Sequence, residues 1–285
     1  MRHEEGSFTA IRNANFYHQS WLPETEPRAV LLLVHGLAEH CGRYMNVVDH
    51  FVPLGYAVYG VDHFGHGRSD GPRVYVERFE DYTDVLKLYV DKVRAWQPDL
   101  PVFMLGHSMG GLIGPYYLLD HQADFAGAII SAPLVKVPDN TSPVTIFLGK
   151  VLSTLLPKFG LLGLDSADLS RDPAVGQAYD ADPLVYRGKT TARLAAEILR
   201  AMQRVTAEAA TMTLPLLILQ GSADKLVDPD GAQLLYDRAS SRDKTLKIYD
   251  GFYHEVLNEP GRDRVLRDVE GWLEAHLPSP TSPGD

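Results

Sequence analysis

The sequence predicts an α/β fold, with a mostly parallel sheet of eight strands flanked by helices. Three observations support this class. Six short apolar runs recur along the chain, the segments between them can hold crossover helices, and two N-terminal runs alternate apolar and polar residues. Continuous apolar runs are typical of strands that are buried on both faces, and such strands form parallel sheets.

The elements are expected in a definite order. The alternating runs SFTAIRN and NFYHQSW predict an antiparallel hairpin at one edge of the sheet. The buried strands then follow within AVLLLVHG (29–36), YAVYGVDH (56–63), PVFMLGHS (101–108), AGAIISAP (126–133), PLLILQGSAD (215–224) and TLKIYDG (245–251).

The spacing of the strands breaks once, after Pro133. About eighty residues separate it from Pro215, too many for one crossover, and prolines interrupt the segment at positions 138, 143, 157, 173 and 183. We therefore expect a helical cap, inserted after the sixth strand, over the sheet edge where open α/β folds bind ligands. The predicted limits are 1–133 and 213–277 for the core, 134–212 for the cap and 278–285 for a disordered tail.

Apolar residues are dense in the first part of this cap. They are Val144, Ile146, Phe147, Leu148, Val151, Leu152, Leu155, Leu156 and Phe159. One interpretation is that they line a ligand site and touch a lipid phase. The alternative is that they only pack the cap onto the core.

Composition excludes several classes of function. The chain has 27 basic and 37 acidic residues, and its net charge of −10 repels nucleic acid. A single cysteine, Cys41, forms no internal disulfide, and the first residues, MRHEEGSFTA, show no secretory signal, so a cytoplasmic location is expected. The longest apolar segment is broken by Lys150, Pro157 and Lys158, which leaves peripheral membrane contact through the cap but no spanning helix. No feature predicts an oligomeric state.

The segment after the third apolar run carries a serine at a sharp turn. Residues 106–110, GHSMG, match the G-x-S-x-G pattern in which a strand turns into a helix and exposes a serine, here Ser108. Such a pattern arises by chance in roughly one chain of this composition in ten, so its place between a strand and a helical pattern carries the argument. The serine is a nucleophile only if a base lies within hydrogen-bond reach.

An acid and a base follow in the order that this turn requires. His254 comes just after the last apolar run, and Asp224 just after the run before it. Asp228 is the alternative acid. Asp224 is preferred because it lies nearer the strand end and because Asp228-Pro229 is typical of a helix start.

The oxyanion of an acyl-transfer reaction needs two N–H donors. The amide of Met109, at the start of a helix, is the first candidate, and the amide of Leu37, after the strand that ends at His35-Gly36, is the second. The nearby histidines His35, His63, His66 and His107 are expected to fix loops. No pattern of metal ligands appears, so neither metal nor cofactor is expected.

Several segments together resemble the monoacylglycerol lipase family of α/β-hydrolases. They are HGLAEHCGRY, DHFGHGRSDG, GHSMGG, LSRDPAVGQAYDADPLV, LQGSADKLVDPDGA and KIYDGFYHEVLNEP, and the similarity extends from about residue 8 to 277. The resemblance implies an α/β-hydrolase fold and hydrolysis of monoacylglycerols to fatty acid and glycerol through an acyl-enzyme. The resemblance implies that Ser108, Asp224 and His254 form the catalytic triad and that the amides of Leu37 and Met109 form the oxyanion hole.

The resemblance also implies a polar end of the site that recognises glycerol. The matching residues are Glu39, Arg43 and Tyr179. Alternatively, Glu39 and Arg43 form a simple surface ion pair and Tyr179 only packs the cap. Leu257 stands where animal members carry a histidine, so glycerol recognition is not carried over in full, and this change suggests a microbial member.

Two further readings compete with this one. A general carboxylesterase or lysophospholipase, or a serine aminopeptidase, would use the same fold. An aminopeptidase needs carboxylates for a substrate ammonium group, for which the candidates are Glu39, Asp168, Asp172, Asp180 and Asp182. A non-catalytic ligand-binding protein of this fold is the more remote reading, because such proteins usually lose a triad residue.

Overall fold

The computed structural model describes residues 1–137 and 151–278, and it confirms the predicted α/β fold. Eight strands form one sheet in the order β1-β2-β4-β3-β5-β6-β9-β10. The strands are β1 (Arg2–Thr9), β2 (Asn15–Leu22), β3 (Ala29–Val34), β4 (Tyr56–Val61), β5 (Val102–His107), β6 (Gly127–Ser131), β9 (Leu216–Gly221) and β10 (Lys244–Tyr249). The hairpin β1-β2 and its junction with β4 are antiparallel, and all other pairs are parallel.

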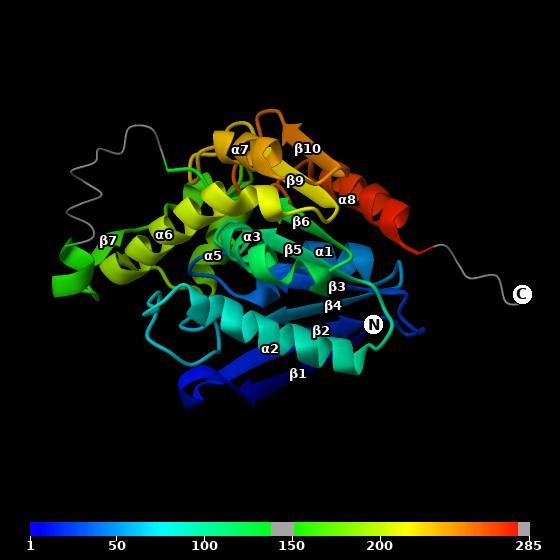
Figure 1. Ribbon diagram of the computed structural model, residues 1–285, viewed down its shortest axis with the longest axis horizontal. Coiled ribbons are helices and arrows are strands. Elements are labelled where there is room, and N and C mark those ends of the chain that lie inside the picture. The colour runs from blue at the N-terminus through cyan, green and yellow to red at the C-terminus, as the bar shows by residue number, and fades with distance from the viewer. Residues whose placement is uncertain (138–150, 279–285) are drawn as a thin grey trace, which may run out of the picture.

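Helices cover both faces of this sheet (Figure 1). The helices outside the cap are α1 (Met45–Phe51), α2 (Glu80–Trp96), α3 (Gly110–His121), α7 (Asp230–Arg238) and α8 (Arg262–His276). Residues of α2, α3 and α7 share one hydrophobic cluster with the sheet, and residues of α1 and α8 share the other. The sheet is therefore the middle of three layers.

The strand β3 shows why these runs fold as buried strands. Its alternate residues belong to different clusters, with Val30 and Leu32 in one and Leu31 and Leu33 in the other. Successive side chains of a strand point to opposite faces, so an unbroken apolar run fills both cores at once. The edge strand β10 differs because Ile248 is half exposed.

The cap follows β6, as predicted. Its described elements are a helical stretch at 151–155, β7 (Gly160–Leu162), α5 (Pro173–Ala181), β8 (Thr190–Thr191) and α6 (Ala192–Glu208), and β7 pairs with β8. They gather at one end of the sheet (Figure 1). The positions 144 and 146–148 named above lie outside the described residues.

Capping and amphipathicity explain the long cap helix α6. The Thr191 hydroxyl accepts the amide of Leu194, which satisfies one of the free N–H groups at the helix start. One face carries buried apolar residues such as Ile198 and Met202, while the opposite side carries charges. Across the described parts of the chain, no helix has both the length and the apolar character that a bilayer crossing needs.

Candidate active site

Ser108 lies at the turn between β5 and α3, in a backbone conformation that residues other than glycine rarely adopt. Its φ is 57°, in the left-handed region. The turn is so tight that neither of the neighbouring glycines has room for a side chain. A Cβ on Gly110 would come within 1.9 Å of the Val34 carbonyl oxygen, and one on Gly106 within 2.5 Å of the Gly110 carbonyl oxygen. The glycines therefore let α3 start directly against the sheet.

The predicted acid follows β9 and the predicted base follows β10, and their side chains contact each other. His254 Nδ1 lies 2.8 Å from Asp224 Oδ2, and both side chains are buried. The other oxygen of Asp224 accepts the amides of Leu226 and Val227 at 2.9 and 3.1 Å. Burial alone would raise the pKa of Asp224, but the hydrogen bond from His254 and these two amides outweigh it and lower the pKa. A carboxylate held in this way stays ionised and fixes the orientation of the histidine ring.

Ser108 and His254 line the same cavity. It has a volume of about 400 Å³ and lies between the core and the cap. Its apolar lining includes Leu134, Leu162, Leu164, Ile198, Leu199, Met202 and Leu226. Asp228 also reaches this cavity, but its carboxylate accepts the amide of Asp230 at the start of α7 and pairs with Lys136. Asp224, and not Asp228, is thus the acid in contact with His254.

The two amides proposed for the oxyanion lie beside Ser108. Within the described residues, the N–H groups of Leu37 and Met109 donate no hydrogen bond, so both are free for a ligand. A Cβ on Gly36 would come within 3.3 Å of the Ser108 Cβ, which shows how close the loop after β3 approaches the serine. The carboxylate of Glu39 fixes this loop by accepting the Gly36 amide at 2.6 Å.

Glu39 and Arg43 form a buried ion pair instead of a surface one. Arg43 Nη1 lies 2.5 Å from Glu39, and the same guanidinium donates to both oxygens of Glu255, the residue after His254. Tyr44 adds a hydrogen bond to Glu39. Burial alone would raise the pKa of Glu39, but Arg43 and His107 outweigh it and lower the pKa. The cavity beside these residues is only about 10 Å³, which leaves room for about one water molecule.

Tyr179 connects the same arginine to the cap. The Arg43 guanidinium lies 4.8 Å from the centre of the Tyr179 ring, a cation–π distance. The Tyr179 hydroxyl is buried without a hydrogen-bond partner among the described residues. Tyr179 also lines a second cavity of about 420 Å³, which shares Leu37 and Leu164 with the cavity of Ser108. Asp165, Asp180 and Arg187 make this second cavity polar.

The cap segment around α5 contacts two loops of the core, the loop after β3 and the loop that carries His254. His40 Nε2 lies 2.8 Å from Asp182, just after α5, and the Ala38 carbonyl accepts the amide of Tyr186. On the other side, Arg171 pairs with the buried Glu259 at 2.9 Å. These contacts hold the cap segment around α5 against the loop of Leu37 and the loop of His254.

The remaining histidines fix loops, as the sequence suggests. His35 Nε2 accepts the amide of His63, while its Nδ1 lies 2.8 Å from the Gly36 carbonyl. His107 Nδ1 lies 3.2 Å from the Ser131 hydroxyl, and burial lowers the pKa of His107 to about 4. Among residues 1–137 and 151–278, no group of three or more potential ligands is placed to hold a metal ion.

Comparison with known proteins gives consistent results. The family model described as "Serine aminopeptidase, S33" matches residues 25–261. A monoacylglycerol lipase from Mycolicibacterium smegmatis is 40% identical over 273 residues, which cover 96% of this chain and 98% of that protein. The human monoglyceride lipase is 39% identical, over 89% of this chain and 84% of that protein.

A solved structure agrees with these sequences. The crystal structure of a Paleococcus ferrophilus monoacylglycerol lipase matches with a TM-score of 0.82 and 30% identity, over 92% of this chain and 99% of that chain. The chain belongs to the monoacylglycerol lipase family of α/β-hydrolases. The resemblance predicted from the sequence motifs is therefore confirmed.

Two residues that organise the site in this family member were not predicted. Gln220 donates to Asp224 Oδ2 at 3.0 Å, and Glu255 binds Arg43 from 212 positions away. Gln220 is the last residue but one of β9 and Glu255 follows the candidate base, so their positions mark them as neighbours of the candidate triad. Only the fold shows which partners they contact.

Proposed function

We propose that this protein hydrolyses monoacylglycerols through Ser108, His254 and Asp224. The observation that carries the proposal is the apolar cavity that Ser108 lines, together with the polar cavity that adjoins it at Leu37 and Leu164. A monoacylglycerol has one apolar chain and one small polar head on either side of its ester. The homologues named monoacylglycerol lipase support the same substrate class.

The reaction follows from the contacts of His254. Its Nδ1 is engaged by Asp224, so Nε2 takes the proton of the Ser108 hydroxyl while the serine oxygen attacks the ester carbonyl. The Leu37 and Met109 amides stabilise the oxyanion. His254 returns the proton to the leaving glycerol oxygen, and it then activates the water that releases the fatty acid.

Within this proposal, glycerol occupies the polar cavity, which Tyr179, Asp180 and Arg187 line. Glu39 and Arg43 serve a different purpose. Their charged groups bind other groups of the same chain, and the space beside them has room for about one water molecule. We infer that these two residues position the catalytic loops and do not bind glycerol.

An aminopeptidase activity has less support from the same site. Such an enzyme needs free carboxylates for the substrate ammonium group. Asp168 pairs with Lys225, Asp172 accepts the amide of Ala174 at the start of α5, and Asp182 binds His40. Asp180 does line the polar cavity, but Arg187 lines it as well.

The substrate class is tested with a panel of esters. We expect fatty acid release from monoacylglycerols to exceed that from diacylglycerols, triacylglycerols, lysophosphatidylcholine, a short acetyl ester and an aminoacyl amide. Ser108→Ala should abolish hydrolysis of all of them, and a serine-directed fluorophosphonate should label the wild type only. Faster turnover of the amide or the acetyl ester would contradict the proposal, and the absence of both labelling and hydrolysis would support the non-catalytic reading.

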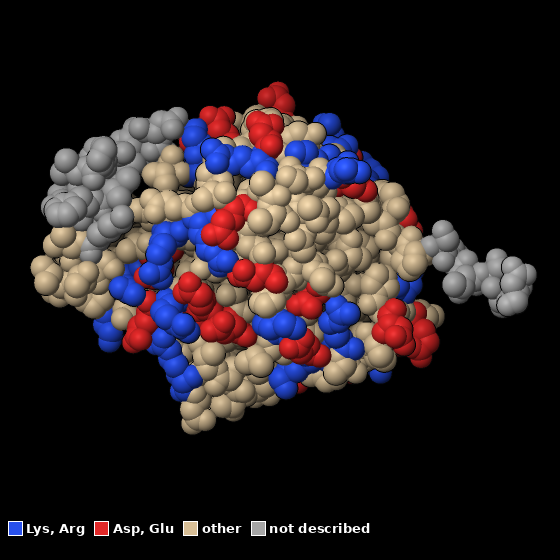
Figure 2. Space-filling model, viewed as in Figure 1, with Lys and Arg blue, Asp and Glu red and all other residues tan. Residues whose placement is uncertain are grey.

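We also propose that residues 134–212 act as a cap whose tip contacts lipid, in a cytoplasmic protein that binds membranes peripherally. The buried thiol of Cys41 requires no oxidising compartment. Leu155 and Leu162 are 71% and 72% exposed, and Leu156 and Phe159 are more than half exposed. Figure 2 shows an uncharged surface at the end of the molecule where Figure 1 places β7. Such an exposed apolar patch marks an interaction site.

Binding to phosphatidylcholine vesicles tests this contact. Leu162→Ser should reduce the vesicle-bound fraction several-fold, because an exposed leucine loses its transfer into the lipid interface. Leu88→Ser is the matched control, since Leu88 is also exposed but lies on α2. Equal binding of both variants and the wild type would refute contact through the cap tip.

A further inference from the structure

A groove between α6 and α7 adjoins the cavity of Ser108. The groove has a volume of about 350 Å³. Three residues line both spaces: Lys136 and Val137 from the segment after β6, and Met202 from α6. Within the described residues, the groove and the cavity of Ser108 therefore share part of their walls.

One face of α6 runs through both spaces. Ala195, Leu199, Met202 and Thr206 follow one another at intervals of three or four residues, which places them on one side of the helix. The first two line the catalytic cavity, Met202 lines both spaces, and Thr206 lines the groove. The helix thus forms a continuous wall from the serine to the far end of the groove.

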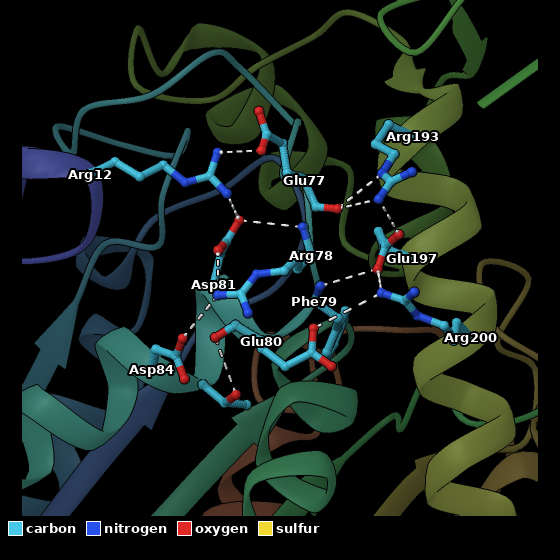
Figure 3. Close-up of polar contacts among 11 residues, drawn as sticks. Arg12, Glu77, Arg78, Phe79, Glu80, Asp81, Asp84, Arg193, Glu197 and Arg200 are labelled. Atoms are coloured by element: carbon cyan, nitrogen blue, oxygen red, sulfur yellow. Dashed lines mark hydrogen bonds and ion pairs between the residues drawn. The ribbon is translucent and has the colours of Figure 1, made fainter. Parts of the chain in front are cut away.

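Contacts near both ends of α6 hold the helix in place. Near its start, Glu197 accepts the amide of Phe79 at 3.2 Å and is paired with Arg193 (Figure 3). Near its end, Arg204 donates to Asp120 of α3 at 2.9 Å. The groove is therefore bounded by a helix that is anchored to the core at both ends.

The chemistry of the groove suits an apolar chain. The Lys136 ammonium lies 3.0 Å from Asp228 and 3.0 Å from Asp230, so its charge is balanced at the start of α7. Leu234 of α7 lines the opposite wall. At the far end, Ala207 of α6 is exposed, so the groove reaches the surface.

We propose that this groove binds the distal end of the acyl chain of long-chain substrates, and that Met202 controls the passage into it. The inference rests on the proposed function, because it assigns the fatty-acyl part of the same substrate. Met202 is buried at the junction, and a methionine side chain is unbranched and changes its rotamer readily. It can therefore close the junction for short chains and yield to long ones.

The test compares hydrolysis of butyryl, octanoyl and palmitoyl glycerol in mixed micelles of constant composition. Ala207→Trp fills the open end of the groove from an exposed position, and the matched control Ala210→Trp adds the same side chain at an exposed alanine that does not line it. We expect Ala207→Trp to lower kcat/KM for palmitoyl glycerol about tenfold, because several methylene groups lose apolar contact, and to leave butyryl glycerol unchanged. Met202→Ala should raise the palmitoyl-to-butyryl ratio about fivefold.

The outcomes separate the two proposals. A chain-length profile of Ala207→Trp that equals that of Ala210→Trp, or a profile of Met202→Ala that equals the wild type, overturns the groove assignment alone. Wild-type protein that releases no fatty acid from any of these glycerides overturns the proposed function instead. Thermal unfolding of each variant shows whether a uniform loss of activity comes from unfolding, which also counts against the groove because it does not depend on chain length.

Discussion

At the scale of single residues, Arg43 joins three segments that are far apart in the chain. It pairs with Glu39 in the loop after β3, with Glu255 beside His254, and with the ring of Tyr179 in the cap. Its planar guanidinium provides the several donors and the flat face that these partners need together. The position of the candidate oxyanion amides relative to His254 therefore depends on this side chain.

Arg43→Gln distinguishes positioning from glycerol binding. If Arg43 positions the two loops, the variant should lose about a hundredfold in kcat with little change in KM, because small displacements of catalytic groups have effects of that size. Steady-state kinetics with a monoacylglycerol gives both constants. Arg171→Gln is the control, since Arg171 also ties the cap to the histidine loop through Glu259 but does not reach the oxyanion loop.

The result that would contradict positioning is a raised KM with an unchanged kcat. That pattern indicates lost binding in the ground state, as expected if Arg43 contacts glycerol. A second variant, Arg43→Lys, keeps the charge but loses the two-oxygen contact with Glu255, so it should recover only part of the activity.

The residues predicted from the sequence are those with a local signature. Ser108 stands in a five-residue pattern, and Asp224 and His254 each follow an apolar strand, so chain order was enough to select them. The partners of Arg43 have no such signature, because Glu255 is brought to it by the parallel sheet. Glu39 and Arg43 were recognised as a pair, but only the fold shows that the pair is buried and enclosed.

At the scale of elements, α6 has two different faces. Its apolar face lines the catalytic cavity, and its charged side contacts the chain near the start of α2 (Figure 3). The contacts on that side involve Arg193, Glu197 and Arg200 of α6 with Glu77, Phe79 and Glu80. Glu197 is the buried member of this group and accepts from both a backbone amide and two arginines.

Glu197→Ala should therefore destabilise the protein by about 2 kcal/mol, because it leaves the buried amide of Phe79 without its acceptor. Urea unfolding followed by fluorescence measures this free energy. Glu208→Ala is the matched control at the end of the same helix, where the pair with Arg204 is partly exposed and should contribute less than about 1 kcal/mol. Equal losses for both variants would show that the buried cluster does not anchor the helix.

The strands were easier to predict than the cap. An unbroken apolar run such as β3 fills cores on both faces, and that signal is present in the sequence itself. In the cap, the short strands β7 and β8 pair through few residues, and Gly160 gives no apolar pattern. The ends of α6 depend on Thr191 and on contacts with the core, and those contacts join parts of the chain more than a hundred residues apart.

At the scale of the whole molecule, four of the six buried histidines have a pKa that is shifted downward. They are His35, His63, His66 and His107. Burial is the main reason that the pKa of each lies below its usual value, and it lowers the pKa of His66 to about 4. In the folded protein these rings are therefore neutral well below pH 6.5.

The pH dependence of stability follows from these shifts. Between about pH 6.5 and pH 4 the unfolded chain binds protons on these histidines and the folded protein does not, so the free energy of unfolding decreases as the pH falls through this range. For His66, a pKa that moves from 6.5 to about 4 gives a loss of about 2 kcal/mol at pH 5 relative to neutral pH. His66→Gln removes this share, so its free energy of unfolding should decrease less than that of the wild type between neutral pH and pH 5. Denaturant unfolding at both pH values tests this, with the exposed His121→Gln as control. If both variants show the wild-type decrease, the buried ring does not contribute to the acid sensitivity of the fold.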